Sequence, residues 1–182
     1  TAHVPEDRQS VGLVLPFPVA ENLVLCTYYQ APFSKGIILQ YDAILEHAEK
    51  LIREFDIRTP SALTPVSTLS GGNQQKVILA RELSRNPDIL IACHPTHGLD
   101  IGATEYVRQQ LLDERDRGGA MLLISTELDE ILAISDRIAV FFEGQVMGVI
   151  DAADADLNEI GLMMMGIRHD AIKKDNSTGD KD

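Results

Sequence analysis

The hydrophobic positions in the first half of the chain follow a helical rhythm. Apolar side chains recur every three or four positions over residues 19–29 and 42–55, and a loop with Pro32 and Gly36 separates the two stretches. This spacing places the apolar side chains on one face and predicts two amphipathic helices. Before them, residues 1–15 are expected to form a short strand, a polar turn and an apolar segment.

In the second half, short apolar runs alternate with helical patterns. The apolar runs are residues 88–93 and 121–125, and the helical patterns are residues 73–84, 104–117 and 128–134. Apolar runs without alternation are typical of strands that are buried on both faces of a parallel sheet. The order of strands and helices therefore predicts an α/β fold with a largely parallel sheet.

The last part of the chain has a third pattern. Two apolar segments, residues 138–142 and 146–150, flank the dipeptide Glu143-Gly144, which predicts a β-hairpin. A short helix is expected over residues 157–165. From residue 168 onward the chain is polar, and we expect it to be frayed.

Composition and charge narrow the possible functions. The 182 residues are 45% hydrophobic, and 28 acidic against 16 basic residues give a formal net charge of −12. Such a surface repels phosphodiester backbones and no basic patch offsets it, so we expect no nucleic-acid partner. No apolar stretch approaches the roughly 20 residues that span a bilayer. Cys26 and Cys93 lie among apolar residues, which suggests a reducing, cytosolic compartment.

The strongest chemical signal is the octapeptide from Leu69 to Lys76, which reads Leu-Ser-Gly-Gly-Asn-Gln-Gln-Lys. Its two glycines allow a backbone to approach a ligand closely, and a helix is expected to begin after them. The N–H groups at a helix N-terminus, with the hydroxyl of Ser70, suit a phosphate. The alternative is an ordinary Ser-Gly-Gly turn that caps a helix.

This octapeptide resembles the signature motif of the ATP-binding cassette (ABC) ATPases. Residues 86–91 are similar to that family's Walker B strand, and residues 95–100, Pro-Thr-His-Gly-Leu-Asp, are similar to the segment that ends in the D-loop Asp. Several motifs in the family's order argue against a chance resemblance, which covers residues 1–150.

Within the family, the chain is most similar to the second, C-terminal cassette of the tandem ATPases that drive import of simple sugars and nucleosides. Asn73, where most cassettes continue directly with Gln, is characteristic of that type. Tyr28, Tyr29 and residues 32–34 favour the nucleoside branch, which is linked to basic membrane proteins, over the ribose and galactose branch.

The resemblance implies a P-loop NTPase-like, RecA-like parallel sheet core with an α-helical signature subdomain. No Gly-x-x-x-x-Gly-Lys-Ser/Thr loop occurs in the chain, so we expect the first strand and the phosphate loop to be missing. Thr1 is not a natural start, which also predicts a fragment of a longer protein. The expected parts are the end of a core strand with the Q-loop region (1–15), a helical subdomain ending in the signature helix (16–86), a core with the Walker B-like strand, D-loop and C-terminal hairpin (87–166), and a flexible polar tail (167–182).

Because ABC cassettes pair face to face, the resemblance implies that this signature contacts ATP held by a partner cassette. The expected contacts are Leu69, Ser70, Gly71, Gly72, Asn73 and Gln74, with Asp100 in the D-loop.

Four positions depart from the residues that the family uses for catalysis. Cys93 and His94 stand where the Walker B Asp and the catalytic Glu are expected, Thr126 replaces the switch histidine, and Glu6 replaces the Q-loop glutamine. Thiolate is a poor ligand for Mg²⁺, and imidazole differs from carboxylate in geometry and pKa. We expect no catalytic residue and no metal site in this half. The full-length assembly is expected to use ATP and Mg²⁺, and the fragment to bind neither.

These inferences give the hypothesis of an ATP-binding subunit of a bacterial ABC importer, which couples ATP binding and hydrolysis to uptake of sugars or nucleosides. The resemblance implies three partners: the other cassette of the same chain, membrane-spanning permease subunits and, indirectly, a solute-binding protein. The implied location is the cytoplasmic face of the inner membrane. The alternatives are a soluble non-transport ABC protein and a purely structural, non-hydrolysing cassette.

Two smaller patterns admit other uses. Cys93, His94 and His97 would supply soft metal ligands, but three ligands without a fourth form a weak metal motif. The run from Met163 to Met165 could offer a copper or binding surface, and we expect instead an apolar packing turn.

Overall fold

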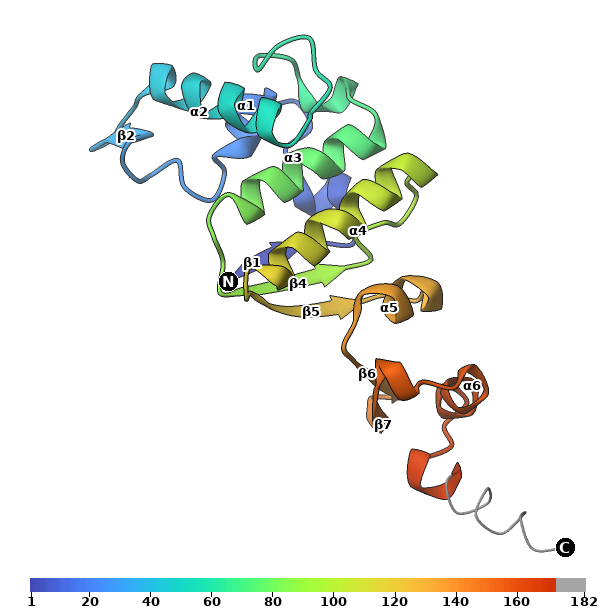
Figure 1. Cartoon of the computed structure of the whole chain (residues 1–182). Coiled ribbons are helices and arrows are strands. Elements are labelled where there is room, and N and C mark those ends of the chain that lie inside the picture. The colour runs from blue at the N-terminus through green and yellow to red at the C-terminus, as the bar shows by residue number, and fades with distance from the viewer. Residues whose placement is uncertain (173–182) are drawn as a thin grey trace, which may run out of the picture. The chain divides into compact units, whose positions relative to one another are not determined.

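The structure is a computed structural model that describes residues 1–172 (Figure 1). The chain divides into two compact units, of which unit 1 is Thr1–Thr126 and unit 2 begins at Glu127. Within the described range, no helix is both long enough and apolar enough to cross a membrane.

A three-stranded parallel sheet lies at the centre of unit 1. Its strands are β1 (Ala2–Val4), β4 (Ile89–Cys93) and β5 (Ala120–Ile124), and their order in the sheet is β1-β4-β5. The predicted α/β fold with a parallel sheet is therefore confirmed. Because parallel strands need long crossover connections, helices join them.

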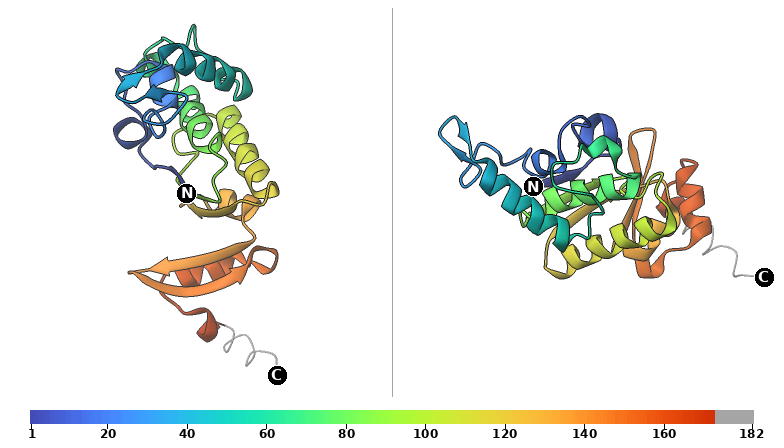
Figure 2. Two further views of the ribbon diagram at one scale, coloured as in Figure 1. Left: turned by 90° about the vertical axis from the view of Figure 1, so that its left-hand side faces the viewer. Right: turned by 90° about the horizontal axis from the view of Figure 1, so that it is seen from above.

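Two helices cover one face of this sheet, α3 (Gly71–Leu83) and α4 (Ile101–Asp116) (Figure 1, Figure 2). The strands turn Leu90 and Ala92 toward the covered face, where both are buried. The helices contribute buried apolar side chains to the same core: Val77, Ile78, Leu79, Leu83, Val107 and Leu111. Removing these side chains from water is what holds the helices on the sheet.

The other face of the sheet is exposed in the described part of unit 1. Leu122 and Ile124 of β5 are 54% and 45% exposed, and Ile89 of β4 is 47% exposed. The expectation that these strands are buried on both faces was therefore wrong. An apolar run indicates that a strand favours burial, but burial requires other elements that pack on the sheet. Within the described residues of unit 1, only α3 and α4 cover the sheet, and both lie on the same face.

The segment between β1 and α3 is largely helical and irregular. It contains a π-helical turn (Arg8–Gly12), α1 (Val19–Leu23), a small hairpin of β2 (Ser34–Lys35) and β3 (Ile38–Leu39), α2 (Tyr41–Glu54) and a 3₁₀ turn (Val66–Thr68). Helix α2 agrees with the predicted pattern. The helix predicted over residues 19–29 ends at Leu23, and the β2–β3 hairpin stands where a loop was expected.

Unit 2 is a hairpin with helices packed against it (Figure 2). It consists of α5 (Leu128–Ile134), β6 (Arg137–Phe142), β7 (Gln145–Asp151), a 3₁₀ turn (Ala152–Asp154) and α6 (Leu157–Met164). The predicted hairpin is present, and both residues of its turn, Glu143 and Gly144, have positive φ. Positive φ at both turn residues is typical of the tight hairpin turns whose backbone twist matches the twist of the flanking strands.

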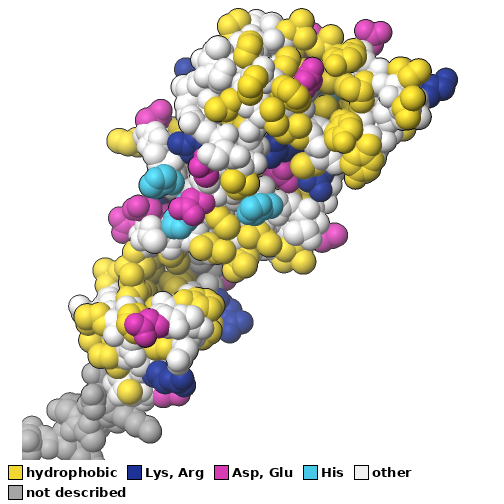
Figure 3. Space-filling model, turned by 180° about the vertical axis from the view of Figure 1, so that it is seen from behind, with side chains coloured by type: hydrophobic (Ala, Val, Ile, Leu, Met, Phe, Trp, Pro, Cys, Tyr) yellow, Lys and Arg dark blue, Asp and Glu magenta, His cyan; other side chains and the backbone are white. Residues whose placement is uncertain are grey.

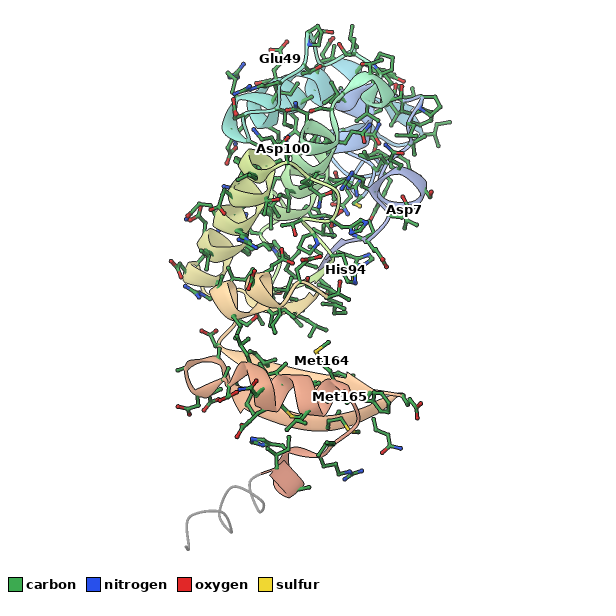
Figure 4. The ribbon with its side chains drawn as sticks, turned by 90° about the vertical axis from the view of Figure 1, so that its right-hand side faces the viewer. Asp7, Glu49, His94, Asp100, Met164 and Met165 are labelled. Carbon is green, nitrogen blue, oxygen red and sulfur yellow. The ribbon has the colours of Figure 1, made fainter. Side chains whose placement is uncertain are left out.

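The end of unit 2 packs more closely than the sequence predicted. Met163 is buried in the core with Ile172, so the start of the predicted tail belongs to the folded unit. Met164 and Met165 are 55% and 66% exposed (Figure 4). The apolar packing turn expected at the three methionines therefore holds for Met163 alone, because successive helical residues point in different directions. Residues 173–182 of the predicted tail lie outside the described range, and the predicted boundaries at residues 15, 86 and 166 stay predictions.

Candidate functional site

The N-terminus of α3 is built around one serine. Ser70 is the N-cap, and its Oγ accepts hydrogen bonds from the main-chain N–H of Asn73 at 3.4 Å and from Asn73 Nδ2 at 3.0 Å. The helix begins at Gly71 rather than near residue 73, because a serine side chain can satisfy a donor of the first turn. The glycines thus form the first turn of the helix, and Ser70 itself is exposed.

Gly72 lies where α3 and α4 approach each other. A Cβ atom at Gly72 would be 2.9 Å from the Cβ of Ala103, in the first turn of α4. That separation is too short for two carbon atoms, so a residue with a side chain would push the helices apart. The absence of a side chain at residue 72 therefore allows the two helices to pack closely, and it also leaves the N-terminus of α3 accessible.

The arrangement at the start of α3 is suited to an anion. The first N–H groups of a helix have no acceptor within it, and they carry the positive end of the helix dipole. No acidic side chain lies in the first turn of α3 to oppose that charge. A hydroxyl, several N–H donors and little side-chain bulk together can bind phosphate oxygens.

Gln74 and Gln75 point into the protein. Gln74 Nε2 donates to the carbonyl of Val66 at 3.2 Å, and Gln75 Nε2 donates to the carbonyl of Pro95 at 2.8 Å. Both side chains are 2% exposed. Their contacts hold α3 to the segments on either side of it. Of the predicted ATP contacts, Gln74 is thus the one that is buried.

Three of the four altered positions come together at one edge of the sheet. Glu6, His94 and Thr126 each follow the carboxyl end of a strand, and parallel strands have their carboxyl ends at the same edge. Glu6 and Thr126 are exposed, and His94 is partly buried. The fourth altered residue, Cys93, is the last residue of β4. Figure 4 shows His94 in this part of unit 1.

The loop after β4 is held by its backbone. His94 has a φ of 44°, in the left-handed region, and its N–H donates to the carbonyl of Ile124 at 2.7 Å. Cys93 Sγ lies 3.9 Å from His3 Nε2. Over residues 1–172, no three His, Cys, Asp or Glu side chains gather as a metal-binding group, so Cys93, His94 and His97 do not converge.

Asp100 begins α4 in the same way that Ser70 begins α3. It is the exposed N-cap, and its Oδ1 accepts a hydrogen bond from the N–H of Ala103 at 2.8 Å. The predicted D-loop aspartate therefore has a defined local role as a helix cap. Asp100 and the octapeptide are separate in the sequence. The first turn of α4, which follows Asp100, nevertheless packs against Gly72 through Ala103.

Sequence reasoning missed a charged cluster around Lys76, the last residue of the signature octapeptide. Lys76 Nζ donates to the main-chain carbonyl and to Oδ2 of Asp56, both at 2.7 Å, and lies 4.3 Å from the centre of the Tyr106 ring. Tyr106 in turn donates its hydroxyl to the carbonyl of Phe55 at 2.9 Å. The hydrogen bond and the charge of Lys76 lower the pKa of the Asp56 carboxyl, and burial raises the pKa of Tyr106 to about 12.

A model of the ABC transporter family matches residues 6–97. The nucleoside import ATP-binding protein NupA of Lactococcus lactis is 52% identical over 164 residues, which cover 90% of this chain and 32% of NupA. The guanosine import ATP-binding protein NupO of Bacillus subtilis is 49% identical with the same coverage. The glucose import ATP-binding protein TsgD13 of Haloferax volcanii is 44% identical and is covered to 30%. The chain thus spans about a third of the length of these relatives.

Solved structures have the same fold. A dimeric structure of the ATP-binding cassette MJ0796, described as a post-hydrolysis state bound to ADP and Pi, aligns with a TM-score of 0.66 at 22% identity. The alignment covers 83% of this chain and 62% of that one. The parallel sheet with its covering helices is therefore an ABC cassette fold.

Proposed function

The chain belongs to the ABC transporter family, and from that premise we propose that it is part of the second cassette of the tandem ATPase of a nucleoside importer. The greater identity to the nucleoside and guanosine import proteins, 52% and 49%, than to the glucose import protein, 44%, supports nucleosides over sugars. The chain spans about a third of the length of these relatives, so the phosphate-binding loop is proposed to lie in another part of the full-length protein.

We propose that the N-terminus of α3 binds ATP that is held by the other cassette of the same protein. The observation that carries this proposal is the exposed Ser70 cap followed by two glycines, in a first turn without acidic residues. Ser70, Gly71 and Gly72 would donate to the terminal phosphate, with Leu69 and Asn73 beside them. Asp100 would lie in the D-loop. ATP supplies the bond that is hydrolysed, and these residues orient it and stabilise negative charge.

The nucleotide site formed on this half is proposed not to hydrolyse ATP. Hydrolysis requires oxygen ligands for Mg²⁺ and a carboxylate that positions water, whereas β4 ends in Cys93 and His94. The residues present therefore do not fit magnesium. Thr126 and Glu6, in place of the switch histidine and the Q-loop glutamine, agree with this assignment. The protein would use ATP and Mg²⁺ at the opposite composite site.

The proposed partners follow from the same assignment. They are the other cassette, membrane-spanning permease subunits and, through them, a solute-binding protein. The proposed location is peripheral, on the cytoplasmic face of the cell membrane. The irregular helical segment between β1 and α3 would face the permease.

The test compares ATP hydrolysis by the full-length protein, assembled with its permease, carrying either Gly72→Asp or His94→Ala. Gly72→Asp should reduce kcat by roughly a hundredfold or more, because it puts a negative charge and a side chain where main-chain N–H groups are expected to meet phosphate oxygens. His94→Ala should change the rate by less than about twofold, because little catalysis is left at that site.

Gly72→Ala is the matched control, since it adds a Cβ without a charge and shows how much of the loss comes from crowding Ala103. Nucleotide binding is measured for each variant by equilibrium titration. If His94→Ala removed most of the hydrolysis while Gly72→Asp retained it, the proposed roles of the two sites would be wrong.

A further inference from the structure

Three consecutive residues after β1 bind three different parts of unit 1. Asp7 (Figure 4) fixes the π-helical turn, because its Oδ1 accepts hydrogen bonds from the N–H groups of Gln9 at 3.0 Å and Ser10 at 2.9 Å. These bonds lower the pKa of the Asp7 carboxyl. With the turn fixed, the side chains of the next two residues extend in defined directions.

Arg8 extends to the loop that leads into α4. Its Nη1 donates to the carbonyl of His97 at 2.8 Å, and its Nη2 donates to the carbonyl of Gly98 at 3.5 Å. The planar guanidinium can meet two successive carbonyls at once, which the single ammonium group of a lysine cannot do with the same geometry.

The same guanidinium lies between two glycines. A Cβ at Gly98 would be 3.3 Å from Arg8 Nη2, and Gly98 also has a φ of +66°, a conformation that favours glycine. A Cβ at Gly71, the first residue of α3, would be 3.5 Å from the same nitrogen. Arg8 is therefore packed against the loop before Asp100 and against the first turn of α3.

Gln9 makes the third connection. Its Nε2 donates to Oε1 of the buried Gln74 at 3.2 Å, and Gln74 Nε2 donates to the carbonyl of Val66. This chain of bonds joins the turn after β1 to α3 one turn beyond Gly71. A displacement of the turn would thus act on α3 at two points.

We infer that Arg8 is a positioning residue for ATP hydrolysis: it holds the N-terminus of α3 and the loop before Asp100 in the relative placement that the nucleotide of the other cassette requires. This inference rests on the proposed function of α3. Arg8 donates from Nη1 and Nη2 to protein carbonyls and packs beside Gly71 and Gly98, and the inference is that it acts through these two glycines.

A positioning role predicts a particular kinetic pattern. Small errors in the placement of reacting groups cost rate more than affinity, since the lost interactions are those made in the transition state. Replacing Arg8 should therefore lower kcat and leave KM for ATP nearly unchanged. A residue that bound ATP directly in the ground state would raise KM instead.

The test measures steady-state ATP hydrolysis by the full-length protein assembled with its permease. Arg8→Gln should lower kcat by roughly tenfold to a hundredfold with KM changed less than about twofold. Arg8→Lys, which keeps the charge and one donor group, should recover part of that loss. Arg137→Gln is the control, because Arg137 is exposed in unit 2 and its ion pair with Asp151 is long at 3.8 Å.

Gly72→Asp is measured in parallel, so that the two claims can fail separately. If Gly72→Asp abolishes hydrolysis but both Arg8 variants keep the wild-type kcat, only the role of Arg8 is wrong. A rise in KM with unchanged kcat would also overturn it. If the Gly72→Asp variant hydrolyses ATP at the wild-type rate, the proposed function of α3 is wrong, and the inference about Arg8, which rests on it, is wrong as well. Should Arg8→Gln not fold, as judged by circular dichroism, the kcat and KM of Arg8→Lys decide the question.

Discussion

Lys76 joins three segments of unit 1 that are far apart in the sequence. Its ammonium group binds the carbonyl and carboxylate of Asp56, just after α2, and lies over the ring of Tyr106 on α4. The side chain is largely buried, with 12% of its surface exposed, whereas that of Asp56 is 67% exposed. The bond to the main-chain carbonyl and the ring contact should therefore matter more than the exposed ion pair.

Lys76→Met tests this expectation. It keeps the length of the side chain but loses both contacts, and should lower the free energy of unfolding by about 1–2 kcal/mol. Urea denaturation followed by circular dichroism gives the value. Lys35→Met, at an exposed site in β2, is the control and should leave the midpoint unchanged. Equal midpoints for the two variants would show that the Lys76 contacts do not stabilise the fold.

At the scale of elements, the sequence predicted those features that leave a local pattern. The spacing of apolar residues predicted α2 within one residue at each end, and the apolar runs predicted β4 and β5. The exposure of one face of β5 could not be predicted from the sequence, because the burial of a strand depends on which other elements pack against it. The Lys76 cluster was also missed, since residues 56, 76 and 106 have no periodic relation that would indicate contact.

The junction of α3 and α4 depends on how closely their first turns approach. Gly72→Ala should destabilise unit 1, because its Cβ would lie 2.9 Å from that of Ala103. Adding Ala103→Gly restores the space, so the double variant should be more stable than the sum of the single changes by about 1 kcal/mol, a coupling typical of residues in contact. Ala103→Gly alone costs about 1 kcal/mol through the low helix propensity of glycine.

Urea denaturation of the wild type and the three variants completes this double-mutant cycle. A coupling energy within error of zero would mean that the two helices can separate slightly at no cost. The close approach seen here would then not constrain residue 72, and the crowding component of Gly72→Asp would also be absent.

At the scale of the whole molecule, unit 1 presents apolar surface to water. Figure 3 shows hydrophobic side chains, with histidines among them, over one side of the unit. The exposed face of the sheet contributes Ile89, Leu122 and Ile124. Adjacent exposed apolar side chains promote association, whereas single ones have little effect.

The isolated chain is therefore expected to self-associate as its concentration rises. Leu122→Gln, in the middle of β5, should weaken association by roughly tenfold, since less apolar surface would be buried between copies. Sedimentation velocity over a concentration series measures this. Leu63→Gln, at an exposed position whose sequence neighbours are not exposed apolar residues, is the control. A chain that stays monomeric throughout the series, or an equal effect of Leu63→Gln, would contradict the expectation.

The two hydrogen bonds that Ser70 Oγ accepts from Asn73 have a consequence for selectivity. A hydroxyl oxygen has two lone pairs and one hydrogen. The N–H and Nδ2 of Asn73 occupy both lone pairs, so only the hydrogen is left to face a ligand. Ser70 can therefore recognise an acceptor such as a phosphate oxygen, while a ligand that offers a donor finds no lone pair there. The helix cap thus leaves the Ser70 hydroxyl as a hydrogen-bond donor toward the proposed nucleotide site.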